Sequence, residues 1–169
     1  MIRLAILLAL MGSTAAAETR YLCWRGNGGY TMTGRFTFPD SLATADLVTG
    51  AQVEEFEIEG FLDGEPVGRW SLADRTAQTS WLLRYSPVQG RFLVGDLDDG
   101  LYQMWNGSGD VDDCGTPGFG FNAGNAGQDV CIDDTYIWQS TIDPLTPLLT
   151  YNAPRDPRTC SNEPLLGKR

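Results

Sequence analysis

Two aspartate-rich segments carry the side chains best suited to chemistry in this chain. Asp96-Leu97-Asp98-Asp99-Gly100 and Asp110-Val111-Asp112-Asp113 set carboxylates at alternate positions close to glycines. Calcium takes several oxygen ligands from a flexible loop, so these segments predict a calcium site. The candidate ligands are Asp96, Asp98, Asp110, Asp112 and Asp133. Neither segment has the glutamate that closes an EF-hand loop. The alternative to a calcium site is that both segments are acidic turns that promote solubility.

A second candidate site lies where Trp105 and Asn106 open the glycine-rich segment 106–130. An exposed aromatic ring beside an amide can stack on a sugar and hydrogen-bond to its hydroxyl groups. These two residues are therefore candidate ligand-binding residues of a carbohydrate-binding module. The alternative is that Trp105, like most large rings, belongs to the core.

The chain of 169 residues contains no histidine. This excludes Ser-His-Asp and Cys-His catalysis, because the proton carrier is missing. A pair of carboxylates could still hydrolyse a glycoside, but no motif selects a pair among the 22 acidic residues. We therefore expect a non-enzymatic binding or envelope-associated module with no cofactor apart from the calcium considered above.

The four cysteines, Cys23, Cys114, Cys131 and Cys160, predict two disulfides. Of the three pairings we favour Cys114–Cys131, which closes the glycine-rich segment, and Cys23–Cys160, which ties the ends of the domain. A zinc site is disfavoured because the sequence has no close C-x-x-C pair.

The first 17 residues have the layout of a cleaved secretory signal peptide. A cationic start with Arg3 is followed by the apolar run 4–11 and by Ala15-Ala16-Ala17. The apolar run is shorter than the ~20 residues that a membrane-spanning helix needs. We therefore expect a periplasmic or extracellular protein without a membrane span, in a compartment where cysteines oxidise.

The charge of the chain limits its partners. The formal net charge is −10, which disfavours nucleic acid because such a surface repels phosphate. The partners that the sequence permits are a carbohydrate or an envelope protein, and the oligomeric state is left open.

The elements that must hold these residues are predicted to be strands. Segments 30–38 and 55–62 alternate between apolar and polar residues, as half-buried strands do. Asp63-Gly64 predicts a hairpin to a strand at 67–72. Further strands are expected at 81–85, 91–94, 101–105 and 136–142, and a short helical turn at 43–49. Twenty glycines and nine prolines fit an all-β chain.

We therefore predict an all-β fold, a single antiparallel β-sandwich with two disulfides and a long glycine-rich loop at 106–130. The sandwich is expected to span residues 18–143, and the proline-rich tail 144–169 to pack on it or trail from it.

Three short motifs recur in the predicted strands: Gly34-Arg35-Phe36, Gly68-Arg69-Trp70 and Gly90-Arg91-Phe92. Their irregular spacing excludes a repeat array. The motifs are best interpreted as a glycine bend, an outward arginine and an inward ring, and the alternative is a repeated ligand contact.

The alternating segment 30–38, followed by Ala45-Asp46-Leu47 and Phe56-Glu57-Ile58, resembles the β-rich domain of small exported bacterial proteins of unknown function. The resemblance covers residues 24–95 and includes no catalytic motif. It implies a fold and not an activity.

Overall fold

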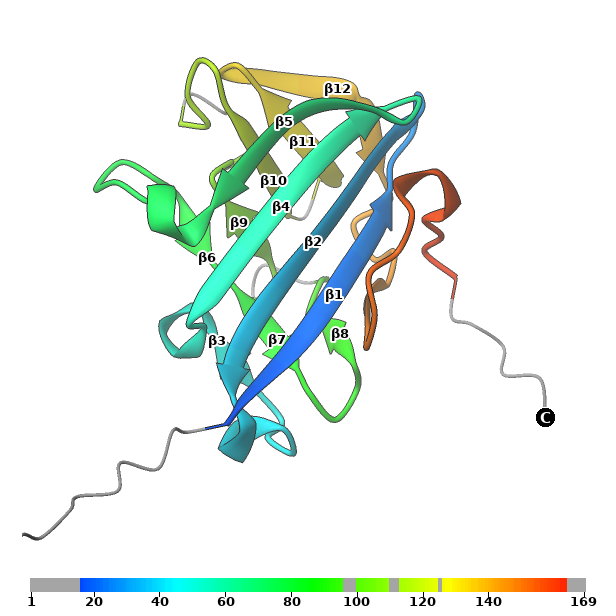
Figure 1. Cartoon of the computed structure of the whole chain (residues 1–169). Helices are drawn as coiled ribbons and strands as arrows, with labels where there is room; N and C mark the ends of the chain where they lie inside the picture. Colours follow the sequence, from blue (N-terminus) through cyan, green and yellow to red (C-terminus); the bar gives the residue numbers. More distant parts are fainter. Residues whose placement is uncertain (1–15, 96–99, 110–112, 125, 164–169) are drawn as a thin grey trace, which may run out of the picture.

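The computed structural model describes residues 16–95, 100–109, 113–124 and 126–163. It is all-β, with two antiparallel sheets (Figure 1). The larger sheet contains β1 (Ala17–Arg25), β2 (Tyr30–Pro39), β3 (Val48–Thr49), β4 (Glu55–Leu62), β5 (Glu65–Ser71), β7 (Arg84–Ser86), β8 (Arg91–Phe92) and β13 (Leu148–Tyr151). Its strand order is β3-β7-β8-β13-β1-β2-β4-β5.

The smaller sheet has five strands in the order β12-β11-β10-β9-β6. They are β6 (Trp81–Leu82), β9 (Gln103–Trp105), β10 (Phe119–Ala123), β11 (Gln128–Ile132) and β12 (Thr135–Ile142). The described chain also contains four short 3-10 helices: η1 (Asp40–Leu42), η2 (Gly50–Gln52), η3 (Leu72–Asp74) and η4 (Pro157–Thr159). In the described part of the chain, no helix is long and apolar enough to cross a membrane.

The core between the sheets consists mainly of aromatic rings. Phe36 of β2 lies 4.9 Å from Tyr85 of β7 and 5.1 Å from Phe92 of β8 between ring centroids. Because these strands belong to one sheet but are not neighbours, the large sheet must curl around its own core. Phe56 of β4 meets Trp105 of β9 at 4.9 Å, which joins this core to the smaller sheet.

The strand predictions with clear alternation are confirmed. β2 and β4 pair over eight residues, and Phe36 and Phe56 of these strands are both buried. β7 and β8 overlap the strands predicted at 81–85 and 91–94, and they pair as a hairpin with Tyr85 opposite Phe92. The segment that starts at Trp81 divides between the sheets, because Trp81 pairs with Trp105 of β9.

The predicted long glycine-rich loop contains two strands, β10 and most of β11. The glycines in this segment allow close backbone approaches. A Cβ atom at Gly120 would collide with the carbonyl oxygen of Asn106, and one at Gly118 with that of Cys114. Strand pairing here therefore requires glycine, although glycine weakens an ordinary strand.

Two further expectations differ from the structure. β13, at Leu148–Tyr151, lies between β8 and β1 inside the large sheet, so the proline-rich segment after residue 143 supplies a central strand instead of a tail. The helical turn expected at 43–49 is absent from that described segment, which instead contains β3. The strand β1 had no clear sequence signal, because Arg20 interrupts the apolar side of its pattern.

Candidate functional site

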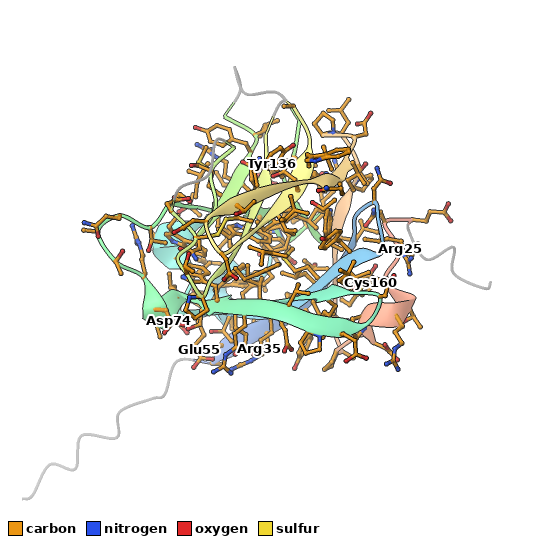
Figure 2. All side chains as sticks on the ribbon, turned by 90° about the horizontal axis from the view of Figure 1, so that it is seen from above. Arg25, Arg35, Glu55, Asp74, Tyr136 and Cys160 are labelled. Atoms are coloured by element: carbon orange, nitrogen blue, oxygen red, sulfur yellow. A yellow bond between two sulfur atoms is a disulfide. The ribbon has the colours of Figure 1, made fainter. Side chains whose placement is uncertain are left out.

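An open groove of about 800 Å³ lies on the outer face of the large sheet. Strands β1, β2, β4 and β5 form its floor, and Figure 2 shows Arg35, Glu55 and Asp74 on this outer side, away from the core. We call it the outer-face groove. Its polar lining includes Tyr21, Thr33, Arg35, Glu57, Glu59, Arg69, Ser71, Asp74 and Arg155.

The strand register places these side chains together. Arg35 of β2 lies opposite Glu57 of β4, and Thr33 lies opposite Glu59. Arg69 of β5 is the partner of Glu59 on the other side. Because alternate residues of a strand point to the same face, these charges all face outward, while Phe36, Ile58 and other intervening residues fill the core.

Arg35 is held in place by two carboxylates. Its Nε donates to Glu57 Oε1 at 2.6 Å and its Nη1 donates to Glu55 Oε2 at 3.1 Å. The hydrogen bond and the charge of Glu57 raise the pKa of Arg35 above its ordinary value. This arginine therefore keeps its charge, but its donors are partly occupied by the protein.

Arg155 lies on the wall of the groove, in the segment that follows β13. The centre of its guanidinium lies 4.4 Å from the centroid of the Tyr151 ring. Its Nε is buried, and no hydrogen-bond partner lies near it within the described residues. Buried donors are almost always paired in native proteins, so the protein itself does not satisfy all the donors of this guanidinium.

Three more charged side chains of the groove, Arg69, Glu59 and Asp74, form no salt bridge among the described residues. Arg69 and Glu59 are exposed and are cross-strand partners. In the part of the chain that the structure describes, neither belongs to a salt bridge. The groove therefore presents two arginines, Arg69 and Arg155, and two acidic residues, Glu59 and Asp74, that form no salt bridge within the described structure.

The Cys23–Cys160 disulfide fixes the segment that carries the groove wall. Cys23 lies in β1, and the bridge spans 137 residues of sequence. Arg25 adds to the attachment, because its Nε donates to Cys160 O at 2.6 Å and its Nη2 donates to Arg158 O at 3.0 Å. Residues 152–163 are thus tied to the edge of the groove, and we call them the C-terminal strap.

Both predicted disulfides are confirmed. The second, Cys114–Cys131, links the segment before β10 to β11. Asp133 and Asp134 form the turn between β11 and β12 and have positive φ angles of 51° and 54°. Asp133 Oδ1 accepts a hydrogen bond from Gly118 N at 3.0 Å, so these carboxylates support the segment that the disulfide closes.

The calcium hypothesis concerns mostly residues outside the described structure. Asp96, Asp98, Asp110 and Asp112 all lie there, and only Asp133 of the five candidates is described. Among the described residues, no group of three acidic or cysteine side chains is arranged to hold a metal ion. Calcium binding by this set stays a prediction.

Trp105 is not the exposed ring that a sugar site at this position would need. Its side chain is fully buried and packs against Phe56, Phe92 and Phe121. Asn106 is also buried, and its Nδ2 donates to the carbonyl oxygens of Cys114 and Phe119, both at 2.9 Å. The expected exposure is therefore wrong, because the tightly packed glycines bring β10 over both residues.

Asp129 is a buried carboxylate that the sequence did not single out. It lies in β11, is 2% exposed, and accepts one hydrogen bond from Asn122 Nδ2 at 3.4 Å. Burial raises its pKa to about 6, while the hydrogen bond from Asn122 acts in the opposite direction. The charged form is thus disfavoured in the folded protein.

The groove could be anticipated only in part. Two of the three Gly-Arg-ring motifs supply groove residues, Arg35 and Arg69, with Phe36 and Trp70 buried behind them. The motif thus predicted the orientation of each arginine. Arg155 had no such signal, because its position depends on the disulfide and on β13.

No protein-family model, characterised protein or solved structure matches this chain significantly. The inference of function therefore depends on the chemistry of the groove and on the compartment that the sequence and the disulfides favour.

Proposed function

We propose that this chain is an exported, non-enzymatic binding module that takes an acidic ligand in the outer-face groove. Export is supported by the signal-like residues 1–17 and by two disulfides, which persist in the periplasm or outside the cell. The ligand identity within this class is left to experiment.

The buried Nε of Arg155, which has no partner in the described structure, is the observation that carries the proposal. A carboxylate in the groove would pair with the guanidinium of Arg155, which is partly exposed and lines the groove. Arginine is suited to the task, because its planar fork of donors matches the two oxygens of a carboxylate. Stacking on Tyr151 keeps the guanidinium plane in place before the ligand arrives.

The second unpaired arginine, Arg69, supplies another cation on the same groove lining. Its neighbour Glu59 would favour a ligand that also carries a donor or a basic group. The net charge of −10 does not prevent such binding, because charges farther away than about 8 Å are largely screened at physiological salt.

A purely binding role is supported by the state of the groove carboxylates. Glu57 is paired with Arg35, and Glu57 and Glu59 are both exposed to solvent. The acid of a glycosidase is instead held in a setting that favours its protonated form near neutral pH. The absence of histidine from the sequence removes the commonest alternative proton carrier.

The proposal is tested by thermal-shift and calorimetric titration of the oxidised protein with trigalacturonate and with triglutamate. At least one of these probes should raise Tm and bind saturably. Each charge-assisted hydrogen bond contributes about 1.5–3 kcal/mol, so Arg155→Ala should weaken binding about ten- to a hundredfold. Arg69→Ala should weaken it as well.

Arg91→Ala is the matched control, because Arg91 is exposed but does not line the groove. It should leave binding unchanged. The proposal is wrong if neither probe binds, or if the Arg69→Ala/Arg155→Ala double variant binds as well as the natural protein.

A further inference from the structure

Strand β12 exposes two aromatic side chains on the side of the molecule opposite the outer-face groove. Trp138 is 68% exposed and Tyr136 is 37% exposed. The other tryptophans are buried or packed against the core cluster. Trp138 is therefore the most exposed tryptophan of the described structure.

The two exposed rings lie two residues apart in β12, whose pairing with β11 becomes irregular after Ile137. Tyr136 is paired with Cys131, whose disulfide to Cys114 lies outside the core cluster. Ile137, between the two rings, packs against the core. Tyr136 and Trp138 are both exposed, whereas Ile137 is partly buried. Figure 2 shows Tyr136 on the outer side of the small sheet, away from Arg35.

The Tyr136 side chain and the backbone that follows Trp138 are held in place before any ligand binds. The Tyr136 hydroxyl lies 2.9 Å from Thr141 Oγ1 in a hydrogen bond. The backbone after Trp138 is anchored as well, because Asn27 N donates to Ser140 O at 3.0 Å and Asn27 Nδ2 donates to Thr141 O at 2.6 Å. A fixed binding surface loses little conformational entropy on binding.

We propose that Tyr136 and Trp138 form an aromatic platform that binds a neutral polysaccharide. One face of a sugar ring consists of C–H groups, which stack on the electron-rich face of an aromatic ring. The hydroxyl edge of the sugar meets polar groups beside the rings, namely the Tyr136 and Thr141 hydroxyls and the exposed Gln139 amide. The two exposed rings can contact different residues of one sugar chain.

The surrounding charges select a neutral polymer. Asp133 and Asp134 precede β12, Asp143 follows it, and all three are exposed. Because these carboxylates flank the strand that carries the rings, they repel anionic polysaccharides locally. The aromatic platform is separate from the outer-face groove, so this inference does not depend on the function proposed above.

Affinity electrophoresis in native gels tests the platform, with hydroxyethylcellulose, xylan or glycogen as the neutral polymer in the gel. Migration should be slowed in at least one of the three. Trp138→Ala should reduce the affinity at least tenfold, and Trp138→Phe should retain part of it. Trp138 is so exposed that both variants should keep the natural Tm and circular dichroism spectrum.

Val88→Ala is the matched control, since Val88 is 56% exposed and lies in the turn between β7 and β8. It should migrate as the natural protein does. Three results would overturn the inference: no retardation by any of the three polymers, retardation that Trp138→Ala leaves intact, or Trp138-dependent retardation that is stronger with polygalacturonate. Self-association that depends on Trp138, without retardation, would instead identify a protein interface.

Discussion

Removing each disulfide separately should reveal how differently the two bridges stabilise the fold. The Cys23–Cys160 bridge spans 137 residues, and the Cys114–Cys131 bridge spans 17. A crosslink restricts the unfolded chain more when its loop is longer. The loop-entropy relation gives about 5 kcal/mol for the first bridge and about 3 kcal/mol for the second.

All four cysteines are buried, with exposed fractions of 1–3%, so Cys→Ala replacement removes a similar amount of packing at either bridge. The expected difference of about 2 kcal/mol between the stability losses of the two double variants therefore comes from loop entropy. It should appear in guanidinium unfolding of Cys23→Ala/Cys160→Ala and Cys114→Ala/Cys131→Ala, followed by tryptophan fluorescence. For a domain of this size it corresponds to a difference in Tm of about 4–8 °C.

The reasoning would be refuted if both double variants lost equal stability, or if removal of the shorter bridge cost more. Equal loss would mean that Arg25 and its bonds to Cys160 O and Arg158 O hold the C-terminal strap without the disulfide. Hydrogen exchange of the strap amides would then be slow in the Cys23→Ala/Cys160→Ala variant, whereas we predict fast exchange.

Trp24→Phe should cost about 1 kcal/mol more than Trp105→Phe in chemical unfolding, because Trp24 Nε1 donates to Gln128 Oε1 at 3.0 Å while the buried Trp105 Nε1 has no partner in the described structure. If the two substitutions lowered the free energy of unfolding equally, the Trp24–Gln128 hydrogen bond would not contribute as proposed. Asp129→Asn should stabilise the protein at pH 7 by up to about 3 kcal/mol. The raised pKa means that Asp129 favours the folded state below about pH 3.8 and that this contribution is lost as pH rises through about 6. Unfolding curves of the natural protein and of Asp129→Asn from pH 4 to 7 check this. The same pH dependence of the free energy of unfolding in both proteins would contradict it.

The strands β2 and β4 could be predicted from the sequence because their polar, solvent-facing residues alternate with apolar, core-facing residues. The strands β10 and β11 could not, since glycine is common in turns and a local pattern does not show that Gly120 lies against Asn106. β13 was missed for a related reason: its place beside β1 depends on a pairing across more than a hundred residues.

The candidate site was less predictable than the fold. The sequence interpretation of Trp105 failed because burial depends on which strand covers a ring, and Trp138 is the exposed one instead. Arg35 and Arg69 could be assigned an outward direction from their motifs. Their convergence with Arg155 depends on the sheet order and on the Cys23–Cys160 bridge.

Arginine side-chain NMR tests the central claim, ligand binding in the outer-face groove, most directly. The Nε–Hε signals of Arg69, Arg91 and Arg155 would be followed in ¹⁵N-labelled oxidised protein during titration with trigalacturonate and with triglutamate. We predict that the Arg155 and Arg69 signals shift saturably with at least one probe, with a common Kd, while the Arg91 signal does not move. An unchanged Arg155 signal with both probes, or equal shifts of all three arginines, would contradict the account.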